Sequence, residues 1–146
     1  MTQRKYWEKE IITELREFSL TKTGEKNLME EICFLDKCIE MEGDDKERRR
    51  LIRKCDALKK RVIPLRLQIN RMERALAVLE PEKRYIIEAI FFRGLSYEDV
   101  MAEQYIEHTK FYDLRRCAIQ ELIRAVYGID IRHLSGEMPK DSDSDT

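Results

Sequence analysis

The stretch LSYEDVMAEQYIEHTKFYDLRRCAIQEL, residues 95–122, decides the fold that the sequence predicts. It indicates a short helix beginning at Ser96, a turn at residues 105–107 and a longer helix starting near His108. Ser96 with Asp99 is an S-x-x-D start, in which the hydroxyl accepts from a first-turn N–H and the carboxylate faces the positive end of the helix dipole. The pattern therefore predicts two helices joined by a very short turn.

The second of these helices has an apolar face and a polar face. Its apolar residues recur at spacings of three and four: Phe111, Leu114, Ala118 and Leu122. Polar and charged side chains gather at its N-terminal end: His108, Thr109, Lys110, Tyr112, Asp113, Arg115 and Arg116. The recognition helix of a DNA-binding helix-turn-helix presents this end to the major groove.

The composition is typical of a protein built from long helices. Charged residues make up 39% and hydrophobic residues 42%, with only five glycines and three prolines. No apolar run approaches the ~20 residues needed to span a bilayer. The opening residues, MTQRKYWEKE, lack the apolar core of a signal peptide. We therefore expect a cytoplasmic protein with no membrane partner.

The chemistry-bearing residues do not form an enzyme or metal motif. Four cysteines occur: Cys33, Cys38, Cys55 and Cys117. A disulfide framework is not expected without a secretion signal, and a metal site would need closely spaced cysteines or nearby histidines. Because no Gly-rich phosphate loop or nucleophile elbow occurs either, we expect buried thiols, no catalytic residues, no cofactor and no metal.

Two amphipathic helices are expected at the N-terminus. The first, residues 4–18, has one apolar face: Trp7, Ile11, Leu15 and Phe18. A break follows at Leu20–Gly24, where Thr23 could cap the next helix. The second helix covers about 25–42 and ends at Gly43.

A third and longest helix is expected over about 45–79. Its apolar residues alternate spacings of four and three: Leu51, Cys55, Leu58, Val62, Leu65, Ile69, Met72, Leu76 and Leu79. Four unbroken heptads predict a coiled-coil seam. Pro64 inside the seam is expected to kink the helix at a cost of ~3 kcal/mol, the alternative being a split near Val62.

The partner of this 51–79 seam is left open by the sequence. It either pairs with the second helix as an antiparallel hairpin turning at residues 43–45, or pairs with its copy in a homodimer. The helix is also basic, with 12 Lys/Arg against 5 Asp/Glu over residues 44–79, a net charge of +7. Such a face is either a solvated surface or a contact for nucleic-acid phosphates or an acidic partner.

The C-terminal half is expected to be a helical domain over residues 80–128, following a 1–79 coiled-coil region. Pro81 suits the first turn of a helix that runs to about Arg93. Gly94 ends that helix, and Gly128 ends the last one. Residues 129–134 are expected to pack back, and the acidic tail within the 129–146 segment is expected to be disordered.

A series of short motifs spans residues 79–122: Leu79, Pro81, Lys83-Arg84-Tyr85-Ile86-Ile87, Gly94-Leu95-Ser96-Tyr97-Glu98-Asp99-Val100, Tyr105-Ile106, Phe111-Tyr112, Ala118 and Leu122. These residues resemble region four of bacterial sigma factors and related phage regulators. The Tyr-Ile-x-x-x-x-Phe-Tyr spelling after a helical hairpin is most similar to the ArpU-type (RinA-like) transcriptional regulators of phages and prophages in Gram-positive bacteria.

The resemblance implies an all-α protein with a helical hairpin or coiled coil followed by a sigma region-four-like helix-turn-helix. It implies double-stranded DNA as partner, RNA polymerase as a further one, and control of late phage genes in the bacterial cytoplasm. The positions expected to face bases are His108, Thr109, Lys110 and Asp113. Tyr112 and Arg116 fall where phosphate contacts are usual.

Two features depart from the family and support an alternative. Glu107 stands where the family usually has serine, and residues 81–127 carry 7 Lys/Arg against 8 Asp/Glu, a net charge of −1. Because phosphate neutralisation supplies much of non-specific DNA affinity, such a domain should bind weakly alone. The alternative is a helical adaptor that docks on RNA polymerase or a sigma factor without reading DNA, which Glu107 and Asp113 favour. Lys110, Arg115 and Arg116 favour DNA.

Overall fold

The computed structural model describes residues 2–134, which are helical almost throughout and contain no strand. This confirms the all-α class. The described residues divide into two compact units. We call residues 18–71 the hairpin unit, and residues 2–17 together with 72–134 the composite unit. This division differs from the expected one, because the first residues of the chain group with its C-terminal half.

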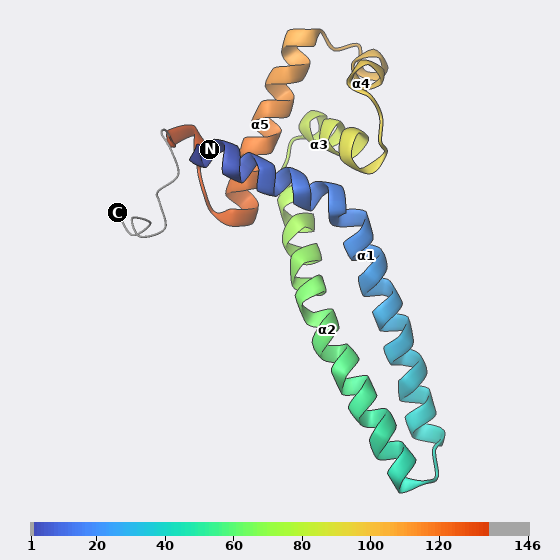
Figure 1. Ribbon diagram of the computed structural model, residues 1–146. Coiled ribbons are helices and arrows are strands. Elements are labelled where there is room, and N and C mark those ends of the chain that lie inside the picture. The colour runs from blue at the N-terminus through green and yellow to red at the C-terminus, as the bar shows by residue number, and fades with distance from the viewer. Residues whose placement is uncertain (1, 135–146) are drawn as a thin grey trace. The chain divides into compact units, whose positions relative to one another are not determined.

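Two long antiparallel helices form the hairpin unit. Helix α1 covers Gln3–Met41 and helix α2 covers Asp45–Ala77, with three residues between them; the hairpin unit takes the later part of α1 and the earlier part of α2 (Figure 1). Its core is a cluster of buried side chains from both helices: Ile32, Leu35, Cys55, Leu58 and Val62. Cys55, Leu58 and Val62 of the seam are therefore buried against α1 within one chain, as the hairpin alternative predicts.

The break expected at Leu20–Gly24 is wrong, since α1 is one continuous helix of 39 residues. A glycine inside a helix costs about 1 kcal/mol relative to alanine, but this cost is offset by packing along α2. The space where a Gly24 Cβ would stand is 3.9 Å from Leu65. The next residue, Glu25, makes a 3.0 Å ion pair with Arg66. Contacts with the partner helix thus outweigh the local break signal.

Pro64 lies inside α2 without ending it, so the one-helix prediction is confirmed over the split near Val62. Proline removes one backbone hydrogen bond, but the buried side chains of Val62 and Ile69 hold the helix on either side of it. At its start, the Asp44 carboxylate accepts from the Glu47 backbone N–H at 3.1 Å, as expected for a cap. The helix ends at Ala77, two residues earlier than expected.

The remaining helices belong to the composite unit: α3 Pro81–Ile87, the π-helix η1 Glu88–Phe92, α4 Tyr97–Gln104, α5 His108–Tyr127 and the 3-10 turn η2 Ile131–His133. The π-helix continues α3, so the helix expected up to Arg93 changes its hydrogen-bonding pattern near its end. The core between α3, η1, α4 and α5 is built from four buried side chains: Ile86, Ala89, Val100 and Phe111. The two helices expected around the short turn are both present.

The first turns of α1 belong to this unit through contacts far apart in sequence. The Arg4 guanidinium donates to the backbone carbonyl of Ile131 at 3.1 Å, and the Trp7 ring lies 5.0 Å from the Tyr127 ring. Ile131 is fully buried, so residues near it do pack back. The acidic tail, with its expected disorder, lies outside the described residues.

Candidate nucleic-acid interface

The turn between α4 and α5 is made by a residue in the left-handed region. Tyr105 has φ 53° and ψ 43° at the C-terminus of α4, the only non-glycine residue with positive φ between residues 2 and 134. After it, the Ile106 N–H donates to the Met101 carbonyl at 3.0 Å. At the other end of α4, the Ser96 hydroxyl accepts from the Asp99 N–H at 3.1 Å, which confirms the expected cap. The chain is thereby redirected into α5 within three residues.

Helix α5 starts without a side-chain cap. Glu107 occupies the N-cap position, and its carboxylate accepts no hydrogen bond from the first turn. No acidic residue lies in that turn either. The first N–H groups of a helix have no partner within the helix and carry partial positive charge. This end of α5 therefore presents donors outward, although Glu107 is a poorer cap than serine.

Six of the seven side chains predicted to contact DNA are exposed on α5: His108, Thr109, Lys110, Tyr112, Asp113 and Arg116. We call these six the α5 face. The Tyr112 ring packs between its neighbours, with centroids 4.6 Å from His108 and 5.8 Å from Tyr97. The α5 face therefore combines an aromatic patch with hydrogen-bonding groups.

The seventh residue, Arg115, is only half-exposed. Its guanidinium lies over the Tyr97 ring, 5.6 Å from the centroid, a cation–π arrangement. Its Nε is buried and has no hydrogen-bond partner among the residues that the structure describes. Arg115 therefore joins α5 to α4, a role that the sequence pattern did not reveal.

Both cations of the α5 face are paired with acids. The Arg116 guanidinium lies 2.7 Å from the Asp113 carboxylate one turn earlier. The Lys110 ammonium lies 3.8 Å from the Glu82 carboxylate of α3. Exposed pairs of this kind contribute only ~0–1 kcal/mol, so a phosphate could displace either acid. The pair with Glu82 was not predicted, because it depends on how α3 and α5 pack.

The four cysteines are unpaired and differ in exposure. Cys55 is buried, and burial together with the Asp36 carboxylate raises the pKa of its thiol. Cys33 is exposed, and Cys38 and Cys117 are half-buried. The expectation of four buried thiols is therefore wrong for three of them. The reason is that Cys33 and Cys38 lie outside the heptad seam, and that Cys117 lies outside the apolar face of α5 formed by Phe111, Leu114, Ala118 and Leu122.

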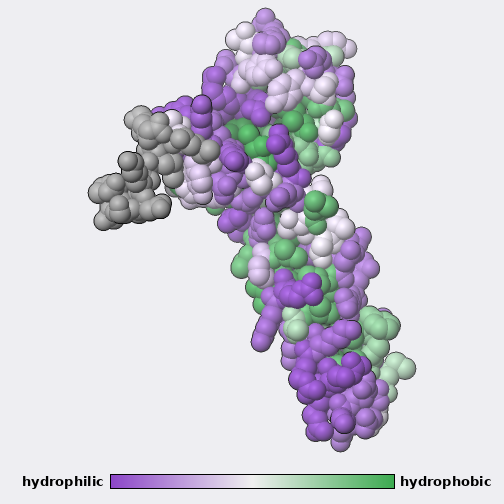
Figure 2. All heavy atoms as spheres, viewed as in Figure 1, coloured by the Kyte–Doolittle hydropathy of each residue, from purple (hydrophilic) through white to green (hydrophobic). Residues whose placement is uncertain are grey.

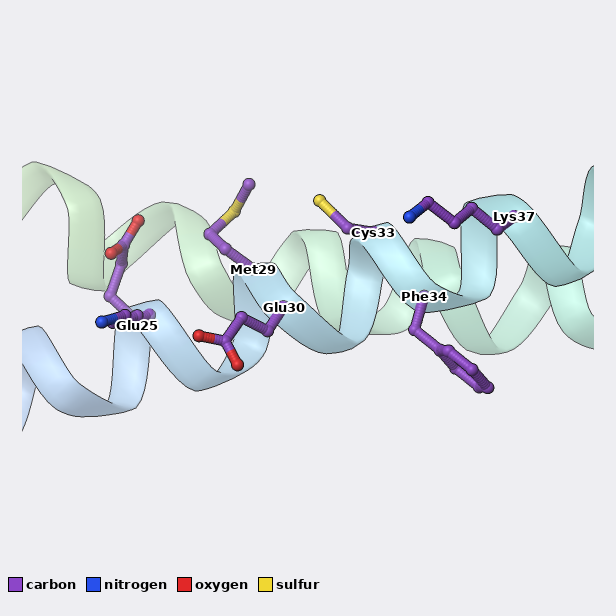
Figure 3. A pocket seen from close by; sticks show the side chains of 7 residues that line it. Glu25, Met29, Glu30, Cys33, Phe34 and Lys37 are labelled. Atoms are coloured by element: carbon purple, nitrogen blue, oxygen red, sulfur yellow. The ribbon is translucent and has the colours of Figure 1, made fainter.

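A surface hollow of about 420 Å³ lies on the hairpin unit (Figure 3). Its lining comes entirely from α1: Glu25, Lys26, Met29, Glu30, Cys33, Phe34 and Lys37. The Phe34 side chain is 64% exposed, and sequence reasoning did not single it out. Within the described part of the chain, no group of three or more His, Cys, Asp or Glu side chains is placed to hold a metal ion. Nor does any helix there have the length and apolar character to cross a membrane.

Comparison with protein-family models, with curated proteins and with solved structures finds no match to this chain.

Proposed function

We propose that this protein is a sequence-specific DNA-binding transcriptional regulator of the ArpU/RinA-like kind, phage- or prophage-encoded and acting on late genes in the bacterial cytoplasm. In this proposal α4 and α5 act as a sigma region-four-like helix-turn-helix. The observation that carries it is the α5 face: six exposed side chains that surround an uncapped helix N-terminus directly after a three-residue turn. A helix N-terminus of this kind suits both phosphate contact and base readout.

Each side chain of the α5 face has a role that its chemistry allows. Lys110 and Thr109 have groups that hydrogen-bond to base edges, and the Asp113 carboxylate accepts from a cytosine amine. Arg116 exchanges Asp113 for a phosphate, which the exposed pair permits at little cost. His108 and Tyr112 place flat rings at the entry of the helix. Arg115 then acts as a positioning residue on Tyr97.

A second candidate function is an adaptor that docks on RNA polymerase or a sigma factor without reading DNA. It is favoured by the pairing of both cations on the α5 face with acids. The net charge of −1 over residues 81–127 points the same way. In this alternative the same helix face makes protein contacts.

Selection of bound sequences from a random duplex library tests the proposal. The wild-type chain should enrich one motif, and Lys110→Ala with Arg116→Ala should lose it. Arg84→Ala with Arg93→Ala is the matched control, because these two cations of the same unit are also exposed and paired with acids. That control should enrich the wild-type motif.

Two outcomes would contradict DNA reading by α5. One is an unchanged motif in the Lys110 and Arg116 double variant at moderate salt. The other is that the wild-type chain enriches no motif but binds RNA polymerase from the host, and that the double variant no longer binds the polymerase. The second result would establish the adaptor. Recovery of bound DNA from the host genome, with and without polymerase, then identifies the target promoters.

A further inference from the structure

The solvent side of α2 carries a line of cations opposite its apolar seam. Lys46, Arg49, Arg53 and Lys60 are separated by three, four and seven residues, so they fall on one side of the helix. We call these four the α2 stripe. At 1.5 Å per residue the stripe is about 21 Å long. Figure 2 shows that the surface of the hairpin unit is strongly hydrophilic at its end near the loop between α1 and α2.

The stripe differs from the α5 face in the state of its charges. All four side chains are exposed, and none takes an ion pair or a hydrogen bond from another residue in the 2–134 range. Two acids lie one helical turn from the stripe: Asp45 is four residues before Arg49, and Asp56 is three residues after Arg53 and four before Lys60. The stripe therefore carries four cations without an ion-pair partner, and nearby acids offset only part of their charge.

A phosphate backbone is the polyanion that fits such a line. Phosphates follow one another closely along duplex DNA, and each one neutralised by a lysine or arginine releases counterions. The hairpin unit carries 14 Lys/Arg against 10 Asp/Glu over residues 18–71, a net charge of +4. Residues 81–127 have no such excess, so α5 alone supplies little non-specific attraction.

We propose that the α2 stripe binds the phosphate backbone of duplex DNA without regard to sequence. This inference rests on the proposed function for the choice of DNA as the polyanion. It divides the work between the two units: the stripe supplies affinity, and the α5 face supplies preference among sequences. No particular placement of one unit against the other is needed, because phosphate contact depends only on reach and charge.

The salt dependence of binding to a random-sequence duplex tests the inference with the full chain. Each phosphate contact contributes about 0.9 to the slope of log affinity against log salt. Arg53→Gln with Lys60→Gln should therefore reduce the slope by about 2 and weaken binding roughly tenfold or more at low salt. Lys26→Gln with Lys37→Gln is the matched control, since these exposed lysines of α1 give the same change in net charge. That control should keep the slope within about 0.5 of the wild-type value.

Three results would overturn the inference. The slopes of the stripe variant and the control variant could be equal. The wild-type chain could fail to bind any duplex at low salt. The wild-type chain could also bind polyglutamate through the stripe while ignoring DNA, which would assign the stripe to an acidic protein. All variants are first checked for wild-type helicity by circular dichroism.

Failure of the stripe and failure of the proposed function are separable in these data. A slope that depends on Arg53 and Lys60, together with no enriched motif in the selection experiment, would leave the stripe standing and remove sequence reading by α5. An enriched motif, together with a salt slope that is unchanged in the stripe variant, would leave sequence reading by α5 standing and remove phosphate binding by the stripe.

Discussion

The Lys83 ammonium of α3 lies 2.5 Å from the Glu121 carboxylate of α5, and 3.0 Å from that of Glu80. The lysine side chain is only 14% exposed. Hydrogen bonding to Glu121, and then to Glu80, raises the pKa of Lys83 above its ordinary 10.5. One largely buried cation thus links α3 to α5 in the composite unit.

This arrangement predicts a loss of stability in alkali. Because the folded pKa is raised, the charged lysine stabilises the fold fully below pH 10.5 and progressively less as the pH rises through the folded pKa. In urea unfolding over this pH range, the free energy of unfolding of the wild type should fall as the pH rises. The fall should be smaller for Lys83→Met. Lys110→Met is the control, because its ion pair is longer and its side chain exposed, and it should decline like the wild type. An identical pH profile for Lys83→Met would refute the assignment.

Two adjacent residues of α1 give a sharp test of the hairpin register. Leu35 is 5% exposed in the core, whereas Phe34 is 64% exposed. Leu35→Ala should lower the free energy of unfolding by about 2–4 kcal/mol, since it deletes buried methyl groups and leaves a cavity. Phe34→Ala should change it by about 0.5 kcal/mol or less. Denaturant unfolding measures both, and equal losses would show that the helix faces α2 with a different side.

Replacing Gly24 inside α1 by alanine should stabilise the protein. A Cβ at Gly24 would meet Leu65 at 3.9 Å, an ordinary contact. Gly24→Ala should therefore raise the unfolding free energy by roughly 0.5–1 kcal/mol. Gly94 is the contrasting position, because its φ of 70° strains any side chain, and Gly94→Ala should lower stability by about 1 kcal/mol or more. Thermal melts of the two variants should shift in opposite directions.

At Tyr105, in contrast, replacement by glycine is expected to stabilise the protein. Its left-handed backbone costs roughly 1–2 kcal/mol in a residue with a Cβ, and its side chain is 96% exposed. Tyr105→Gly should therefore raise the free energy of unfolding by up to about 1 kcal/mol, once the extra chain entropy of glycine is counted, and the melting temperature should rise with it. Tyr105→Val should lower it, because a β-branched residue tolerates positive φ poorly. A lower melting temperature for Tyr105→Gly would mean that the tyrosine ring makes stabilising contacts.

The spacing of apolar residues predicted the helices that bury one face. The seam from Leu51 to Leu79 is visible in the sequence because heptads specify which side of a helix is apolar. They do not specify what covers that side, so the packing of Cys55, Leu58 and Val62 against α1 came from the structure, and the homodimer stays a prediction. The false break at residues 20–24 has a related cause, because local signals do not contain the packing between α1 and α2, such as the ion pair between Glu25 and Arg66.

The α5 face was predictable to the same extent. Exposure of Lys110 and Arg116 follows from the spacing of the apolar residues around Phe111. The withdrawal of Arg115 onto Tyr97 does not follow, because it depends on how α4 packs against α5. The same holds for Trp7 on Tyr127, a contact between the two ends of the described chain.

The bond between Arg4 and Ile131 joins residues 127 positions apart, and this separation has a consequence for synthesis on the ribosome. At about 5–20 residues per second, the first turns of α1 wait on the order of ten seconds for their packing partners. Ile11 and Leu15, fully buried in the finished protein, are exposed to other chains during that wait. The hairpin unit has a shorter delay, since Ile32 and Val62 of its core lie only 30 positions apart. Residues 3–17 therefore keep apolar side chains exposed during synthesis for longer than the hairpin unit does.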